Sequence, residues 1–171
     1  YLATKLASHL TASGGSFQVV QFHPSYSYED FVEGFRPRVA DGNMTYELSP
    51  GPVKNLAQAA RENPGDPYFL IIDEINRGNL AKIFGELYYL LEYRDESLIL
   101  QYGNTTDDEF SLPKNLFVIG TMNTADRSIA MVDAAIRRRF YFVEFSPTEE
   151  PISGLLREWL KRQRFGDGPA L

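Results

Sequence analysis

Two neighbouring carboxylates, Asp73 and Glu74, directly follow the apolar run at 68–72. Adjacent residues at a strand end point to opposite sides, so the two acids cannot do the same job. In a nucleotide site the first carboxylate can hold Mg²⁺ through water, and the second can act as the general base toward the attacking water. A solvated strand end explains the pair alone equally well, but the continuation Ile75-Asn76-Arg77-Gly78 favours the nucleotide site.

A second polar group, at 120–128, follows the apolar run at 116–120. An uncharged amide at a strand tip can bind a terminal phosphate or hold the attacking water without adding repulsion, and Asn123 is the candidate. Asp126 and Ser128 also suit a turn and helix cap. The Asn-x-x-Asp spacing is in addition the one by which small GTPases read guanine. A position beside the catalytic acids favours the phosphate role over the base-reading one.

Three consecutive guanidiniums, Arg137, Arg138 and Arg139, stand between an expected helix and an expected strand. One cation at a helix C-terminus is explained by the helix dipole. Three are more than a cap needs, and arginine suits phosphate binding. The sharper hypothesis is therefore an arginine finger that reaches into a neighbouring subunit's site.

Alternating apolar patterns predict an α/β fold with a mostly parallel sheet, whose ligands lie at the carboxyl ends of the strands. We expect strands at 17–22, 68–72, 116–120 and 141–145, and helices at 2–10, 28–34, 53–62, 79–93, 128–138 and 149–164. Two hairpins are expected, within 38–52 and 98–112.

Composition excludes several classes of protein. The 171 residues contain no cysteine and two histidines, which argues against a disulfide framework and a closed zinc site. The 17 basic and 23 acidic side chains give a net charge of −6, which argues against a broad nucleic-acid-binding surface. No run is long and apolar enough for a membrane span or a signal peptide, so a cytoplasmic protein with no membrane partner is expected.

Three strings, FHPSYSYEDFVEGFRP, IIDEINRGNLAKIFGE and GTMNTADRSIAMVDAAIRRRF, closely resemble the McrB-type AAA+ GTPases of modification-dependent restriction systems, in the dynein-related AAA group. The resemblance covers residues 1–147 and implies a P-loop-type three-layer αβα sandwich. It also implies a role for each candidate residue. Asp73 and Glu74 would be the Walker B pair, with Asp73 binding Mg²⁺ through water, and Asn123 would be the sensor asparagine, in a loop tuned by Asp126 and Arg127. Arg138 and Arg139 would be trans-acting arginines, and Arg77 would lie at the subunit interface.

The same resemblance implies a homo-oligomer, a hexameric ring that hydrolyses GTP with Mg²⁺ and is stimulated by a McrC-like nuclease subunit. DNA would be bound through a separate upstream domain. Two alternatives remain open: an ATP-driven AAA+ remodelling chaperone, and an interaction module that has lost hydrolysis. Intact Glu74, Asn123 and Arg138 favour the enzyme, because a module without catalysis has no chemical need for them.

One departure from the family is large, because no GxxxxGK[ST] phosphate-binding loop occurs in the 171 residues. Residues 1–10 resemble the helix that follows this loop. We therefore expect 1–147 to be a partial large subdomain that lacks the first strand and the loop, and 148–171 to be the start of the lid or a disordered tail. In the family's sheet order, 5-1-4-3-2, the first strand is central, so its absence would separate the strands expected at 116–120 and 141–145.

Overall fold

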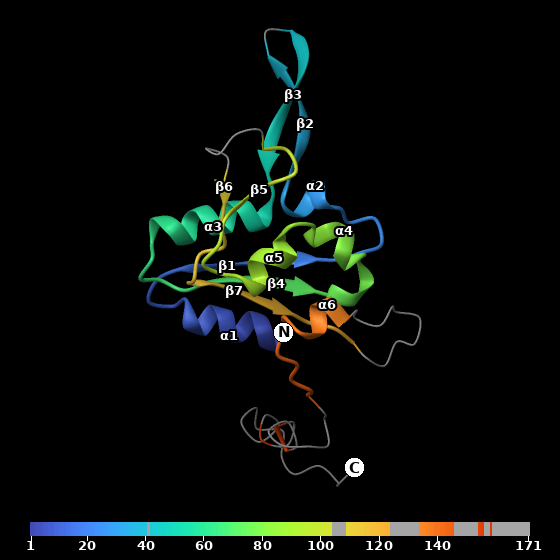
Figure 1. Cartoon of the computed structure of the whole chain (residues 1–171). Coiled ribbons are helices and arrows are strands. Elements are labelled where there is room, and N and C mark those ends of the chain that lie inside the picture. Colours follow the sequence, from blue (N-terminus) through green and yellow to red (C-terminus); the bar gives the residue numbers. More distant parts are fainter. Residues whose placement is uncertain (41, 104–108, 124–133, 146–153, 156–157, 159–171) are drawn as a thin grey trace. The chain divides into compact units, whose positions relative to one another are not determined.

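The computed structural model describes residues 1–171 except 41, 104–108, 124–133, 146–153, 156–157 and 159–171 (Figure 1). The chain divides into two compact units, Tyr1–Arg139 and Phe140–Leu171. All helices and strands discussed below belong to the first unit.

A parallel three-stranded sheet forms the centre of the first unit. Its strands are β1 (Ser16–Gln21), β4 (Tyr68–Asp73) and β7 (Leu116–Gly120), in the order β1-β4-β7. The middle strand β4 is a continuous apolar run, as expected for a strand covered on both faces. The α/β prediction is confirmed, and the order agrees with the 2-3-4 part of the order that the resemblance implies.

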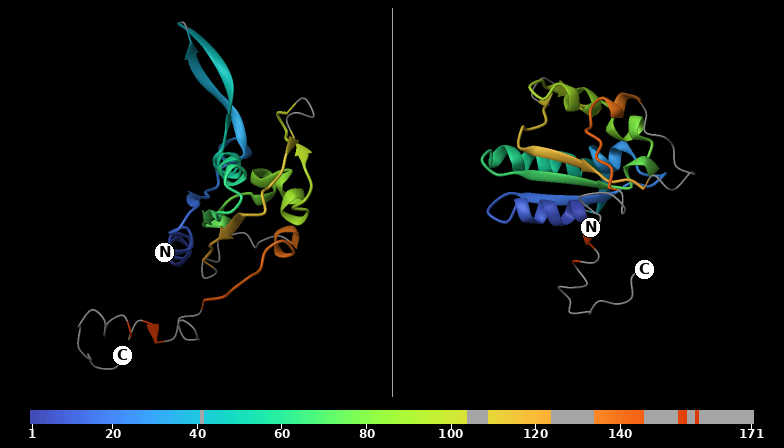
Figure 2. Two further views of the ribbon diagram at one scale, coloured as in Figure 1. Left: turned by 90° about the vertical axis from the view of Figure 1, so that its left-hand side faces the viewer. Right: turned by 90° about the horizontal axis from the view of Figure 1, so that it is seen from below.

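Helices cover both faces of this sheet (Figures 1 and 2). On one face, Phe69 and Ile71 pack with Ala7 of α1 (Leu2–Leu10). Alternate residues of β4 point to the other face, where α3 (Pro52–Glu62) lies. A proline opens α3, where its missing N–H costs no hydrogen bond, and an apolar stripe is buried along the helix.

The prediction of a single helix at 79–93 is wrong in one respect, because the helix is interrupted at Gly85. The two pieces are α4 (Leu80–Phe84) and α5 (Leu87–Glu92). Gly85 has φ 49° and ψ −125°, which an L side chain adopts only with strain. A Cβ there would lie 3.1 Å from the ring of Tyr28, so the break also allows close packing. Periodicity alone could not reveal this.

Two hairpins extend from the layers. The longer one follows α2 (Tyr28–Phe31) and consists of β2 (Glu33–Ala40) and β3 (Asn43–Pro50), so it begins earlier than the range expected from sequence. It projects away from the sheet (Figure 1). The shorter hairpin consists of β5 (Leu98–Ile99) and β6 (Glu109–Phe110).

The strand expected at 141–145 is not formed, although the segment is rich in aromatic and β-branched residues. Its large apolar side chains are exposed. In the described part of the chain, β7 is an end strand, and its second edge has no paired strand. A strand needs a ladder partner to be stable, and among the described residues none pairs with 141–145. Of the helix expected at 128–138, the structure describes α6 (Ala134–Arg137). The one expected at 149–164 lies almost entirely outside the described residues.

Candidate functional site

The carboxyl ends of β4 and β7 are tied together next to the acidic pair. Asp73 is the last residue of β4, and the hydroxyl of Thr121, just after β7, donates a hydrogen bond to its Oδ1 over 2.6 Å. The backbone N–H of Thr121 donates to the carbonyl of Ile72 over 2.8 Å, and the N–H of Ile75 donates to the carbonyl of Thr121 over 3.0 Å. These bonds hold Asp73 at one edge of the sheet with one oxygen already occupied. Sequence analysis did not single out Thr121, although its position right after the adjacent apolar run was a usable signal.

Glu74 leaves the strand in an unusual backbone conformation. Its φ of 54° and ψ of 44° are left-handed, and it is the one non-glycine residue with positive φ among the described residues. This conformation costs about 1–2 kcal/mol for an L residue. It starts a 3₁₀ turn, η1 (Ile75–Arg77), and sends the chain sharply away from the axis of β4. Strained backbone conformations of this kind cluster at functional sites.

The Glu74 carboxylate lies against Arg77. The Nε of Arg77 is 3.3 Å from Oε2 of Glu74, yet that oxygen is buried and has no hydrogen bond of good geometry within the described residues. Asn76, only 9% exposed, likewise has a buried Oδ1 without a hydrogen-bond partner in that part of the chain. A buried acceptor without a donor is costly, so both oxygens are suited to accept from a water or a ligand. The sequence gives no signal for Asn76 beyond its place two residues after the acidic pair begins to leave the strand, at Glu74.

The oxygen donors at the end of β4 fit a hard cation bound mainly through water. Asp73, Glu74 and Asn76 offer oxygens, which Mg²⁺ prefers. No cluster of three or more carboxylate or histidine side chains that could cage a metal occurs among the residues with described positions. Mg²⁺ commonly binds to one or two carboxylates, with water and substrate phosphates completing its shell. The oxygens at the end of β4 are therefore of the kind that could take part in binding a magnesium–nucleotide complex.

The asparagine candidate lies on the continuation of the neighbouring strand. Asn123 is exposed and comes two residues after Thr121, the residue bonded to Asp73. Asp126 and Arg127 lie outside the described residues. The structure thus brings Asp73, Glu74 and Arg77 together at one strand end and places Asn123 on the segment that leaves the adjacent strand.

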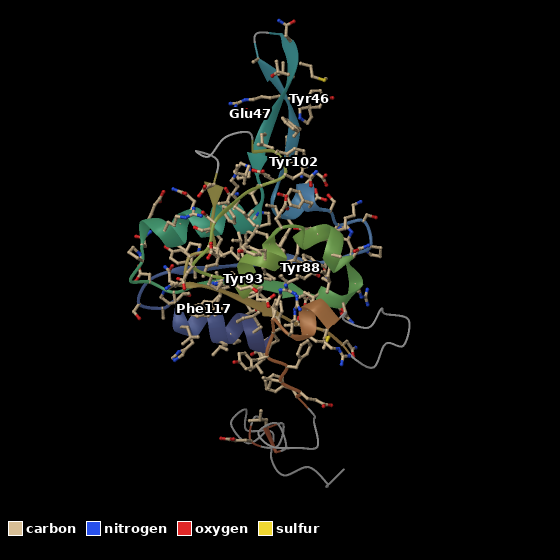
Figure 3. All side chains as sticks on the ribbon, viewed as in Figure 1. Tyr46, Glu47, Tyr88, Tyr93, Tyr102 and Phe117 are labelled. Atoms are coloured by element: carbon tan, nitrogen blue, oxygen red, sulfur yellow. The ribbon has the colours of Figure 1, made fainter. Side chains whose placement is uncertain are left out.

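The two arginines after α6 have different surroundings. Arg139 is 8% exposed, donates from Nε to the carbonyl of Tyr88 over 2.8 Å and lies 2.5 Å from the Glu92 carboxylate. Its guanidinium also lies over the ring of Tyr88, 5.4 Å from the centroid (Figure 3 labels Tyr88). Arg138 is 63% exposed and 3.5 Å from the same carboxylate. Within this chain, Arg139 anchors α6 to α5, whereas Arg138 is largely available at the surface.

Comparisons with known proteins agree with this geometry. The profile of the AAA domain (dynein-related subfamily) matches residues 1–140. The chain is 45% identical over 153 residues to the EcoKMcrB subunit of a type IV methyl-directed restriction enzyme from Escherichia coli, a match covering 86% of this chain and 32% of that protein. It is 31% identical over 131 residues to the component YdiS of the type II restriction enzyme BsuMI from Bacillus subtilis, covering 69% of this chain and 37% of that protein. The chain thus spans about a third of each of these relatives.

A solved structure supports the fold. A Cytophaga hutchinsonii protein named for an inferred ATPase activity aligns with a TM-score of 0.51 and 17% identity, over 98% of this chain and 51% of that one. Within the described residues, no helix combines the length and apolar character needed to cross a membrane.

Proposed function

Because the chain belongs to the dynein-related AAA family, we propose that it is the nucleotide-hydrolysing core of a restriction-system motor that uses GTP. The observation that carries the proposal is the acidic pair at the end of β4. Asp73 is fixed by Thr121, and Glu74 is turned away in a strained, partly unsatisfied position. Two carboxylates with different surroundings at one strand end fit two different roles in phosphoryl transfer.

Each residue has a separate task in this proposal. Asp73 holds the water shell of Mg²⁺, which when bound would neutralise charge on the phosphates. Glu74 takes a proton from the attacking water, and Asn123 donates to the terminal phosphate or holds that water. The ion pair with Arg77 competes for the Glu74 carboxylate, so Arg77 must move for Glu74 to act as a base. Asp126 and Arg127 tune the loop of Asn123.

The 171 residues supply the part of the site that follows the phosphate-binding loop in this proposal. In this proposal residues 1–147 form part of the large subdomain after the loop, and the assignment of 148–171 to the start of the lid or to a tail stays a prediction. We call the chain preceded by its upstream strand and loop the extended protein. It assembles into a cytoplasmic ring, which we propose to be hexameric, with Arg138 and Arg77 at the subunit interfaces and Arg139 holding the segment that carries Arg138.

Two partners complete the proposed system. The E. coli and B. subtilis relatives are named as a subunit and a component of restriction enzymes. We therefore include a McrC-like nuclease subunit that stimulates hydrolysis, and DNA bound through a separate domain. Hydrolysis would drive translocation of the DNA and its cleavage by the nuclease.

Phosphate release by the extended protein, with GTP or ATP and with Mg²⁺ present or chelated, tests the proposal. We expect Mg²⁺-dependent turnover of GTP that increases when the nuclease subunit is added. Nucleotide binding without turnover would instead support the interaction module. Turnover of ATP alone, unaffected by the nuclease subunit, would support a remodelling chaperone.

The length of the chain gives a separate prediction. Within the described residues, the second edge of β7 has no paired strand, and the strand carries exposed apolar side chains such as Phe117, a combination that favours aggregation. We expect the 171 residues alone to be poorly soluble or unable to bind nucleotide tightly, and the extended protein to be well behaved. Thermal melts of both lengths, with and without GTP–Mg²⁺, measure this. A sharp melt of the short chain that nucleotide raises by several degrees would contradict it, because a ligand stabilises only a fold that binds it.

Arg139→Ala and Arg138→Ala should differ in stability. Removing Arg139 deletes the bonds to Tyr88 and Glu92 and leaves a gap between α5 and α6, so we expect a loss of about 1–3 kcal/mol in the free energy of unfolding. Removing the exposed Arg138 should cost at most about 1 kcal/mol. Denaturant midpoints of the two extended-protein variants give the comparison. Equal losses would show that Arg139 is no anchor.

A further inference from the structure

One carboxylate at the end of α5 is shared by two consecutive arginines. Oε2 of Glu92, the last residue of the helix, lies 2.5 Å from a terminal nitrogen of Arg139 and 3.5 Å from one of Arg138. Because both guanidiniums approach the same oxygen, two positive charges lie close together, and they repel each other unless an anion compensates them. The Glu92 carboxylate supplies that anion.

The contact of Glu92 with Arg139 is firmly held. The buried side chain of Arg139 donates from Nε to the carbonyl of Tyr88 over 2.8 Å, and its backbone N–H donates to the carbonyl of Ile136 over 2.9 Å. Since Arg139 is fixed in this way, the carboxylate that it contacts is held in place as well. Glu92 therefore keeps its position at the end of α5 whether or not Arg138 stays beside it.

Arg138 is held only loosely at the same carboxylate. Its side chain is largely exposed, and 3.5 Å is longer than the usual hydrogen bond between these two charged groups. Water and salt screen an exposed pair of this kind, so the pair changes the balance of side-chain orientations by no more than about fivefold. A terminal phosphate carries more negative charge than one carboxylate, so it can draw Arg138 away from Glu92. The contact thus directs the guanidinium without trapping it.

A directed but releasable guanidinium suits an arginine that acts on a neighbouring subunit. A long exposed side chain has many rotamers, and each one that points elsewhere lowers the fraction of molecules in which the guanidinium can meet the phosphate. We propose that Glu92 is a positioning residue for Arg138, which it orients before the guanidinium enters the neighbouring subunit's site. Glu92 acts through Arg138 and makes no contact with the reacting atoms. This inference rests on the proposed function, because it takes the trans-acting role of Arg138 as given.

Mixed rings of the extended protein test this inference, because they show which subunit needs Glu92. The reference ring combines Glu74→Gln subunits, which supply Arg138, with Arg138→Ala subunits, which supply Glu74. Glu92→Gln is then added either to the subunit that supplies Arg138, giving the first mixture, or to the one that supplies Glu74, giving the second. Glutamine keeps an acceptor oxygen for Arg139 but lacks the charge that compensates two guanidiniums. We expect phosphate release to fall about three- to fivefold in the first mixture and to stay within about 1.5-fold of the reference in the second.

Asp95→Asn is the matched charge control in the subunit that supplies Arg138. Asp95 lies three residues after Glu92, is exposed, and forms an ion pair with Lys114. The substitution removes one negative charge near the end of α5, and turnover of its mixture should stay within about 1.5-fold of the reference. Thermal melts should show all variants folded like the parent, and sedimentation velocity should show rings of unchanged size.

Several outcomes would overturn the positioning role. Equal turnover in the two mixtures, whether lost or retained, would show that Glu92 serves the fold of either subunit or nothing at all. Higher turnover in the first mixture would make the contact a restraint on Arg138, and a loss shared with Asp95→Asn or accompanied by smaller rings would assign the effect to general charge or to assembly. An inactive reference ring would overturn the trans-acting role of Arg138 itself, which distinguishes failure of the proposed function from failure of the positioning role alone.

Discussion

Glu74→Gln in the extended protein should abolish nucleotide turnover while nucleotide binding survives. The substitution keeps the size and polarity of the side chain but removes its ability to take a proton from water. Loss of a general base reduces the rate by about 100- to 10,000-fold, and the contacts to the phosphates lie elsewhere. Steady-state phosphate release gives the rate, and fluorescence of a labelled nucleotide gives the dissociation constant.

Asp73→Asn is the matched comparison for this prediction. The neighbouring carboxylate is fixed by Thr121 and is assigned to Mg²⁺, so its loss should weaken Mg²⁺-dependent nucleotide binding as well as turnover. The two variants together separate a base from a metal-binding group. Turnover by Glu74→Gln at the parent rate would show that the base is another group.

Arg138→Ala should also cause a large loss of turnover, although Arg138 directly follows α6 and does not lie at the end of β4 with the two acids. The exposed guanidinium can stabilise the charge that develops on the transferred phosphate in a neighbouring subunit's site. Removing a finger of this kind costs about 1,000-fold or more in rate. Nucleotide affinity should change far less, which single-turnover and binding measurements on the same variant check. Parent-like turnover would remove Arg138 from the catalytic machinery.

The parts of the fold that could be predicted from sequence are those determined by local pattern. The apolar run at 68–72 is long enough for one buried strand and ends in two acids, so both β4 and the acidic pair at its tip could be predicted. The helix at 2–10 and the strand at 116–120 show equally plain patterns. Parallel order then follows from the alternation of strands and helices.

The features that could not be predicted depend on contacts between distant residues. The break at Gly85 depends on the ring of Tyr28, and the bond from Thr121 to Asp73 spans 48 residues. The side chain of Arg139 bonds to Tyr88, which lies 51 residues earlier in the chain. The three consecutive arginines look equivalent in sequence, but this contact makes Arg139 different from the others in the fold. The left-handed turn at Glu74 violates the local preference of its residue type, and such exceptions concentrate at functional sites.

The most direct test of the central claim is a mixing experiment with Glu74→Gln and Arg138→Ala in the extended protein. Each variant alone should be inactive. In a mixed ring, some interfaces pair the intact glutamate of an Arg138→Ala subunit with the intact arginine of a Glu74→Gln neighbour. In an equal mixture about half of the subunits carry the intact glutamate, and about half of their neighbours carry the intact arginine. If subunits pair at random across these heterologous interfaces and each interface acts independently, about a quarter of the interfaces are complete, so about a quarter of the parent turnover should be recovered. No recovery at any ratio, although the subunits exchange, would contradict catalysis shared between the end of β4 and a neighbour's arginine.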